Sequence, residues 1–238
     1  NLPSLLTALV WLHAPREERH ALSARKRFAF EEIFLIQLER QQARMLYEQN
    51  PTFLITPKKE NVDTFIKGLG FPLTGAQNHA IEAIFSDFAS SRAMLRLLEG
   101  DVGSGKTAVA AATAYAVVTT RPESQNYGAL QVGYMCPTEI LATQHFESFI
   151  KYFIGSGMSI GLITGSGCRK FPSKVDPSGW TDISRTQFLK WVANGEIPIV
   201  IGTHAVISKN VQWKHLAYVI IDEQHRFGTK QRAKLVQK

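Results

Sequence analysis

A single glycine-rich segment restricts the fold of this chain more than any other feature. Residues Gly100–Thr107 read GDVGSGKT and match the pattern GxxxxGK[ST]. An apolar run at Met94–Leu98 precedes the segment and an alanine-rich run at Lys106–Val118 follows it, so we expect a strand, a loop and a helix in that order. In this arrangement the backbone N–H groups of the loop and the first helical turn converge on one point, which favours a bound phosphate.

The residue types in the loop fit a nucleoside triphosphate held with Mg²⁺. Glycine has no Cβ, so the backbone can approach phosphate oxygens closely. We expect the lysine to reach the β- and γ-phosphates and the threonine hydroxyl to ligate Mg²⁺. The predicted nucleotide-binding residues of the loop are Gly100, Gly103, Ser104, Gly105, Lys106 and Thr107. The alternative is a glycine-rich turn with a solvent-exposed lysine, which the expected strand and helix disfavour.

After Phe71 the chain alternates short apolar runs with longer helical stretches, which is typical of a parallel sheet covered by helices. Further helices are expected at Glu139–Phe153 and Asp182–Ala193. Further strands are expected at Gln131–Cys136, Ser159–Thr164, Ile197–Gly202 and Leu216–Ile221. Two segments rich in turn-forming residues, 121–128 and 167–179, are expected to be surface loops. The sequence thus predicts an α/β fold with a mostly parallel sheet flanked by helices.

The first 70 residues follow a helical pattern instead. A short helix is expected after Pro3, a long amphipathic one over 21–49 and a third over 60–69. Gly70 to Pro72 then interrupt the chain, so we expect a helical region over 1–70 and an α/β domain over 71–238. The chain starts without a methionine and stops in a basic stretch, and we expect it to be part of a longer protein.

Composition restricts the class of protein without naming its function. The formal charge is +7 and the pI is near 9.5, which favours polyanionic partners. No apolar run is long enough to span a bilayer, and we expect a cytoplasmic protein without membrane contact. Cys136 and Cys168 form neither a CxxC pair nor a zinc-ligand spacing, so neither a disulfide nor a zinc site is expected.

A second candidate for nucleotide chemistry is the acidic pair Asp222–Glu223, which follows the apolar run Tyr218–Ile221. A carboxylate at the carboxyl end of a parallel strand lies where such sheets bind ligands. Asp222 can therefore hold Mg²⁺, and Glu223 can orient and deprotonate the attacking water. The predicted catalytic residues are Lys106, Asp222 and Glu223. An acidic pair that merely begins a turn is the alternative.

Five segments, in this order, resemble the motifs of the RecG family of bacterial superfamily 2 DNA helicases: Leu73–Gln77 (LTGAQ), Gly100–Thr107 (GDVGSGKT), Cys136–Ala142 (CPTEILA), Gly202–Ala205 (GTHA) and Asp222–Gly228 (DEQHRFG). Two N-terminal segments, 2–5 and 27–32, look like the stretch that joins the wedge domain to the motor in that family. The resemblance covers nearly the whole chain. It implies a RecA-like P-loop motor domain preceded by an α-helical extension, acting as an ATP-dependent DNA helicase on branched DNA in recombination and repair.

The resemblance also implies roles outside the phosphate loop. Gln77 would recognise adenine, although Thr74 and Gln77 also fit a capping box. Contacts with the DNA backbone are implied for Pro137, Thr138, Thr164, Gly165, Thr203 and His204. A role in coupling the ATP state to DNA binding is implied for Gln224, His225 and Arg226. The alternatives are a proline at the first helical position for Pro137 and ordinary strand-to-loop turns for the later residues.

The expected partners follow from the same resemblance. We expect a monomeric motor on duplex or branched DNA, with a wedge domain and a second RecA-like domain, the source of arginine fingers, elsewhere in the longer protein. This chain alone should then hydrolyse ATP barely. Arg169, Lys170 and Lys174 in the loop 167–179 could contact DNA phosphates or simply face solvent. Two rival functions remain: an Mfd-like transcription-repair coupling translocase, and a nucleotide-gated module that switches without translocating.

Overall fold

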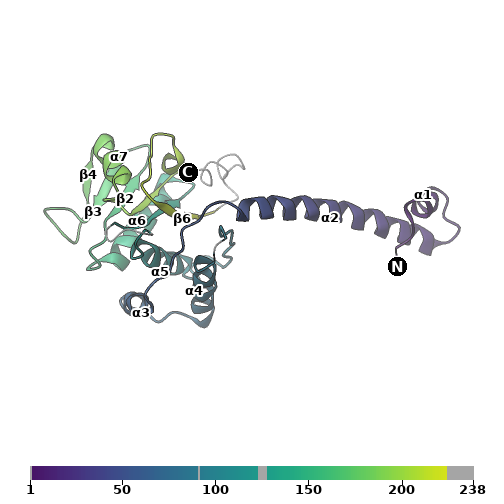
Figure 1. Ribbon diagram of the computed structural model, residues 1–238, viewed down its shortest axis with the longest axis horizontal. Coiled ribbons are helices and arrows are strands. Elements are labelled where there is room, and N and C mark those ends of the chain that lie inside the picture. The colour runs from purple at the N-terminus through teal and green to yellow at the C-terminus, as the bar shows by residue number, and fades with distance from the viewer. Residues whose placement is uncertain (1, 91, 123–127, 224–238) are drawn as a thin grey trace. The chain divides into compact units, whose positions relative to one another are not determined.

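The computed structural model describes residues 2–90, 92–122 and 128–223 (Figure 1). By its internal contacts the chain divides into two compact units, residues 1–51 and 52–238. The first unit is helical and the second holds the whole β-sheet. None of the helices within the described ranges combines the length and apolar character needed to cross a membrane.

The helical unit consists of α1 (Leu5–His13) and the 31-residue α2 (Glu18–Glu48). Ser4 caps α1, since its side chain accepts a hydrogen bond from the Thr7 backbone N–H. Among the contacts that hold this unit together, the Arg27 guanidinium of α2 donates to the Pro3 carbonyl before α1 at 2.6 Å, and the rings of Trp11 and His20 stack 4.1 Å apart. The expected short and long helices are confirmed, with the long one beginning three residues earlier than predicted.

The second unit is built on a six-stranded sheet in the order β4-β3-β2-β5-β1-β6. The strands are β1 (Gln131–Met135), β2 (Ile160–Ile163), β3 (Cys168–Phe171), β4 (Thr181–Ile183), β5 (Ile199–Gly202) and β6 (Leu216–Ile221). Four of them, β2, β5, β1 and β6, are parallel, while β3 and β4 add an antiparallel edge. The mostly parallel sheet is therefore confirmed.

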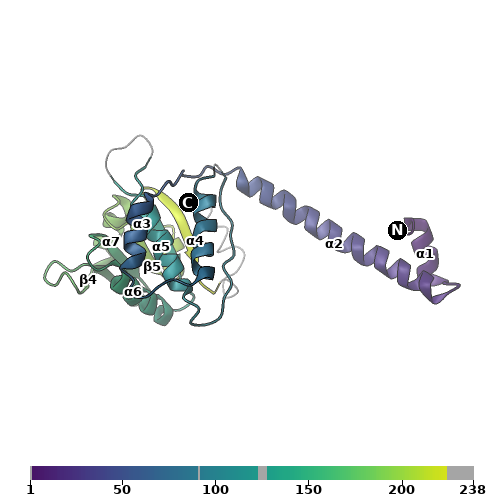
Figure 2. The ribbon, with the colours of Figure 1, turned by 90° about the horizontal axis from the view of Figure 1, so that it is seen from below.

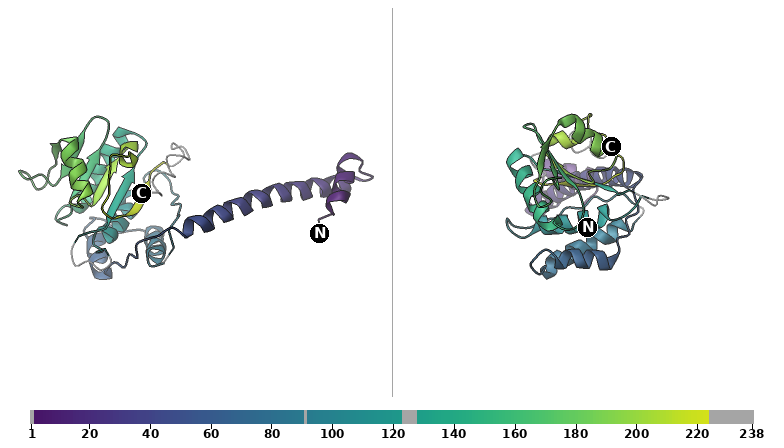
Figure 3. Two further views of the ribbon diagram at one scale, coloured as in Figure 1. Left: turned by 45° about the horizontal axis from the view of Figure 1, so that its top comes forward. Right: turned by 90° about the vertical axis from the view of Figure 1, so that its left-hand side faces the viewer.

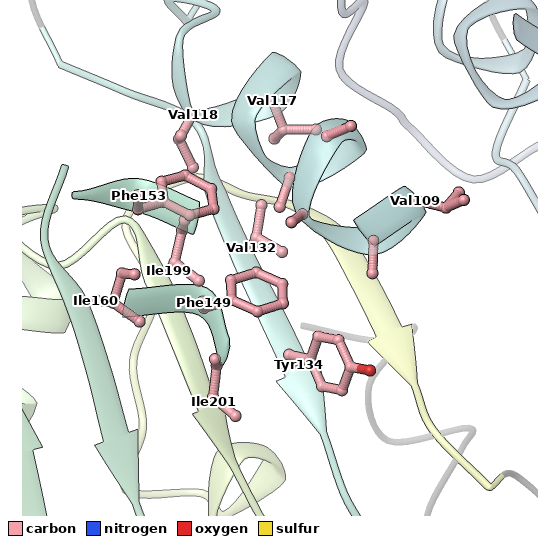
Figure 4. Packing of buried hydrophobic residues seen from close by; sticks show 14 of the residues in the cluster. Val109, Val117, Val118, Val132, Tyr134, Phe149, Phe153, Ile160, Ile199 and Ile201 are labelled. Atoms are coloured by element: carbon pink, nitrogen blue, oxygen red, sulfur yellow. The ribbon is translucent and has the colours of Figure 1, made fainter. Parts of the chain in front are cut away.

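Helices cover both faces of this sheet (Figures 2 and 3). The helical segments are α3 (Lys59–Lys67), α4 (Gly75–Phe88), α5 (Lys106–Val118), α6 (Glu139–Phe153), α7 (Arg185–Ala193) and the 3-10 turn η1 (His204–Ile207). Alternate strand residues point to opposite faces. Val132, Ile199 and Ile201 pack on the side of α5 and α6, as Figure 4 shows, while Ile163 and Val200 pack with α7 and η1.

Two predictions about the sheet are wrong. The run Met94–Leu98 forms no strand, and Leu95 and Leu97 are 72% and 60% exposed, so these side chains are not packed as strand residues would be. The segment 167–179 is not simply a loop, because Cys168–Phe171 forms β3. The antiparallel pairing of β3 with β2 puts the Cys168 and Phe171 side chains in the core. The sequence did not indicate this pairing, because the neighbouring residues are turn formers.

Candidate functional site

The four parallel strands bring several separate sequence motifs to one edge of the sheet. Met135 at the end of β1 is in register with Gly202 of β5 and with Ile221 of β6, and Gly202 is also in register with Ile163 of β2. Parallel strands in register end side by side, so the loops that follow these four residues share an edge. These loops begin at Cys136, Thr164, Thr203 and Asp222.

The phosphate loop has the backbone shape that its glycines permit. Gly103 and Gly105 have φ of 82° and 79°, in the left-handed region that glycine adopts without strain. Gly105 caps α5, whose first residue is Lys106. Ten of the thirteen residues of α5 are buried, and the helix packs against the sheet and against α3 and α4. The loop and the positive end of the helix dipole are therefore held on a rigid support, which suits a bound anion.

Lys106 folds back over its own loop. Its ammonium group donates to the carbonyl oxygens of Gly100 and Asp101 at 2.6 and 2.7 Å. A cation held by two neutral carbonyls is free to exchange them for the oxygens of a phosphate, which are charged and bind it more strongly. The structure places Lys106 where the sequence predicts it, in the phosphate loop and at the first residue of α5.

Gln77 serves as a cap and contacts the phosphate loop at the same time. Its side-chain oxygen accepts from the Thr74 N–H at 2.8 Å, and Thr74 caps α4 in return, which completes a capping box. The amide nitrogen of Gln77 donates to the Ser104 carbonyl at 2.8 Å. A Cβ on Gly105 would lie 2.2 Å from that nitrogen. The capping box predicted as an alternative role for Thr74 and Gln77 is thus present, and it places the Gln77 amide beside the phosphate loop.

Asp222 directly follows β6, and its backbone N–H donates to the Met135 carbonyl at 2.9 Å. The hydrogen bond from His145 is the main cause that lowers the pKa of Asp222, and the charges of His145 and Lys106 add to the effect. The carboxylate is therefore ionised at neutral pH and within electrostatic reach of the phosphate-loop lysine. Glu223 is exposed and has a φ of 52°, the one positive value among the described non-glycine residues.

Sequence reasoning missed His145, which lies in the second turn of α6. Its Nε2 is 2.9 Å from Asp222 Oδ2, and the two side chains are 15% and 22% exposed. An ionised carboxylate only accepts hydrogen bonds, so Nε2 carries the hydrogen. The two residues are 77 positions apart in the chain. His145 directly precedes the buried Phe146 and lies one helical turn, four residues, before the buried Phe149. This place on the helix is the feature of the sequence that hints at such a contact.

The first turn of α6 meets the loop after β2. Thr138 is the N-cap, and its hydroxyl accepts from the Leu141 N–H at 3.2 Å. The Glu139 carboxylate accepts from the Gly165 N–H at 2.8 Å. Hydrogen bonds from Ser166 and then from Gly165 lower the pKa of Glu139. Pro137 precedes the cap, so the alternative that places it at the first helical position is not what the structure shows.

The remaining strand-end residues differ in exposure. Gly165 and His204 are exposed, while the side chains of Thr164 and Thr203 are 3% and 4% exposed. The Thr164 hydroxyl lies 2.9 Å from that of Ser166, inside the turn. These two threonines therefore shape their loops more than they face solvent. Gln224, His225 and Arg226, for which a coupling role is predicted, lie outside the described residues.

The oxygen-bearing side chains of this edge fit a magnesium ion. Mg²⁺ prefers oxygen ligands and keeps several waters, so one carboxylate and one hydroxyl beside a nucleotide phosphate are a sufficient protein contribution. Asp222 offers an ionised carboxylate, and Thr107 offers its hydroxyl from the first turn of α5. When bound, the ion would neutralise the developing charge on the phosphate oxygens.

Curated relatives resemble the chain over almost all of its length. It is 44% identical over 237 residues to the ATP-dependent DNA helicase RecG of Bacillus subtilis, which covers 99% of the chain and 32% of the relative. It is 41% identical to RecG of Thermotoga maritima, over 95% of the chain and 26% of the relative. The chain therefore spans about a third of the length of these relatives.

A solved structure, described as RecG bound to a three-way DNA junction, matches with a TM-score of 0.75 and 36% identity over 96% of the chain and 28% of that structure's chain. The resemblance to RecG predicted from the motifs is thereby confirmed, and so is the RecA-like fold with its helical extension. The family model for DEAD/DEAH box helicases matches residues 74–238. The chain belongs to the DEAD/DEAH box helicase family.

Proposed function

We propose that this chain is the nucleotide-binding first motor domain of an ATP-dependent DNA translocase that acts on branched DNA, such as replication forks and Holliday junctions. The observation that carries the proposal is the gathering of four strand-end loops at one edge of the parallel sheet, with Asp222 within electrostatic reach of Lys106. A helicase needs a nucleotide site and a DNA site that share one rigid support, and this edge offers both.

The roles of the nucleotide residues follow from their positions. Backbone N–H groups from Gly100 to Gly105 would hold the phosphates, Lys106 would bind the β- and γ-phosphates, and Thr107 with Asp222 would hold Mg²⁺. Glu223 would orient and deprotonate the attacking water. Gln77 would recognise the adenine ring, for which it would exchange its bond to the Ser104 carbonyl.

The DNA roles rest on Thr138, Gly165 and His204, which are exposed. The capping hydroxyl of Thr138 accepts one hydrogen bond and still has its own hydrogen to donate to a phosphate. Thr164 and Thr203 would act by holding their loops in shape. In the whole protein we propose a wedge domain, a second RecA-like domain with the arginine fingers, and a boundary near residue 70 between the helical region and the motor domain.

The nucleotide half is tested with Lys106→Ala and the matched control Lys190→Ala. Lys190 is an exposed lysine of α7, which packs on the other face of the sheet from α5. We expect the first variant to lose most of its affinity for a fluorescent, non-hydrolysable ATP analogue and the control to keep it, with both unfolding at the wild-type temperature. Equal affinities in the two variants would remove Lys106 from the site.

The DNA half is tested with Thr138→Ala in the full-length protein, with Ser184→Ala as control. Both residues are N-caps, so both variants lose about 1 kcal/mol of stability. Only Thr138→Ala should weaken binding to duplex and junction DNA, and it should do so evenly across sequences because backbone contacts carry no base information. Equal DNA binding by both variants would restrict Thr138 to its capping role.

Duplex-stimulated ATP turnover by the full-length protein separates a translocase from a nucleotide-gated switch. The similarity of the chain to RecG over 99% of its length favours the RecG-like function over the Mfd-like alternative.

A further inference from the structure

Helix α6 is placed so that it touches both halves of the site proposed above. Its 15 residues run from Glu139 to Phe153, and Ala142, Phe146, Phe149 and Phe153 are completely buried against the sheet. Thr138 and His145 are seven residues apart, which is about 10 Å along a helix. A helix fixed by three buried aromatic rings moves as one body, so its first and second turns keep this spacing.

The second turn of α6 holds Asp222 through His145. The carboxylate receives the imidazole N–H at 2.9 Å on Oδ2. The imidazole is itself held against the Tyr134 ring, with centroids 4.9 Å apart and planes inclined by 35°. Tyr134 is 4% exposed and belongs to β1, so the histidine ring is fixed by the central part of the sheet.

Besides His145, the backbone N–H of Glu223 donates a hydrogen bond to the Asp222 carboxylate. The backbone of Asp222 is fixed by the bond from its N–H to the Met135 carbonyl. The next residue, Glu223, already has a φ of 52° and leaves the strand geometry. A short side chain at the end of a strand can rotate about its χ angles, and a hydrogen bond to one oxygen selects one rotamer. The bond from His145 to Oδ2 therefore helps to set the direction in which the carboxylate faces.

We propose that His145 is a positioning residue that orients the Asp222 carboxylate toward the magnesium–nucleotide complex. The inference rests on the proposed function, because it assumes that Asp222 takes part in holding Mg²⁺. Partners that orient a metal-binding carboxylate in this way commonly change metal affinity 10- to 100-fold when they are removed. His145 touches Asp222 and is not itself assigned to the metal or the nucleotide.

The test compares nucleotide affinity with and without the metal in the 238-residue chain. The dissociation constant of a fluorescent, non-hydrolysable ATP analogue is measured in Mg²⁺ and in EDTA, and the ratio of the two values is the gain due to the metal. In His145→Ala we expect this gain to fall roughly tenfold. The affinity in EDTA should stay near that of the wild type, because it depends on the phosphate loop. A merely structural defect would weaken both values.

Three variants sharpen the result. His145→Gln places an N–H donor at a similar distance along the side chain and should recover most of the gain. Gln144→Ala, an exposed neighbour on the same helix, should keep the wild-type gain. In an Asp222→Ala background, His145→Ala should cause no further loss, because the histidine acts only through the carboxylate. A further loss in that background would mean that His145 binds the complex itself.

The outcomes separate the two proposals. A wild-type chain without any gain from Mg²⁺ would overturn the proposed nucleotide site and this inference with it. A wild-type chain with a clear gain, matched by an equal gain in His145→Ala, would overturn only the role of His145. Thermal unfolding of each variant identifies a folding failure, and His145→Gln then supplies the decisive comparison.

Discussion

Helices α2 and α5 are stabilised in different ways. Helix α5 has 13 residues, ten of them buried, whereas α2 has 31 residues and only Ala24 buried. Tertiary packing therefore fixes α5 and the phosphate loop at its start. Helix α2 depends more on local interactions, such as the pairs Arg27–Glu31 and Arg44–Glu48 on successive turns. The contrast shows where substitutions should affect stability most.

If the sheet unit carries most of the stability, a cavity in its core should have the largest effect. Phe149 is completely buried, stacks on Phe153 with ring centroids 5.6 Å apart and meets Tyr134 edge-on (Figure 4). Phe149→Ala should cost about 4 kcal/mol of unfolding free energy, because it removes the ring and leaves a cavity. Urea unfolding followed by circular dichroism measures the loss. A loss below about 1 kcal/mol would contradict the packing described for α6.

The second-largest loss of unfolding free energy is expected for a buried polar residue in the same unit. The Gln131 amide donates to the carbonyls of Val192 and Ile197 and accepts from the N–H groups of Lys214 and His215. Gln131→Leu should cost about 3 kcal/mol, because it leaves four backbone groups without this partner. Nucleotide affinity should not change. Exposed Gln144→Leu is the control, with an expected change below about 0.5 kcal/mol.

Gln131 also illustrates what the sequence could and could not predict. As a polar residue at the start of an apolar run it fits a strand, and β1 does begin there. Its four partners come from segments 61 to 84 residues away, which no local pattern reveals. His145 was missed for the same reason, because its contact with Asp222 depends on how α6 packs on the sheet. Local patterns were sufficient for the helix that follows the phosphate loop, for the capping box and for the four parallel strands that form.

The two wrong strand predictions have a common cause. The sequence of Met94–Leu98 is apolar enough for a strand, but a strand also needs a partner for its backbone, and this segment forms none of the sheet's ladders in the described residues. The segment 167–179 has turn formers, yet Cys168–Phe171 finds a partner in β2. Pairing between distant segments depends on tertiary structure, so the local sequence pattern alone predicted the wrong secondary structure for both segments.

The two units can also be compared through their helix N-caps, because a serine caps one helix in each unit. Ser4 caps α1 and Ser184 caps α7, and each side chain accepts a backbone N–H at 3.2 Å. Ser→Ala at either position should lower the free energy of unfolding by about 1 kcal/mol, whereas Ser→Asp should keep the cap. Hydrogen exchange of the first turn of each helix measures the local effect. If only Ser184→Ala increases exchange, the α1 cap does not contribute to the helical unit.

The smallest effect is expected on α2. Phe34 is 52% exposed, and its ring lies 5.9 Å from that of Phe30 one turn earlier. Phe34→Ala should change the unfolding free energy by at most about 0.5 kcal/mol, because it removes one pair on the helix surface and little buried area. The measurement is the same urea titration used for Phe149→Ala, which makes the two phenylalanines a matched pair. Phe34 also lines a groove with Leu2, Arg27, Phe30 and Glu31. A loss above about 2 kcal/mol would mean that another group fills this groove in solution. The low burial of α2 would then reflect a missing partner. It would not show that α2 is stable by local interactions.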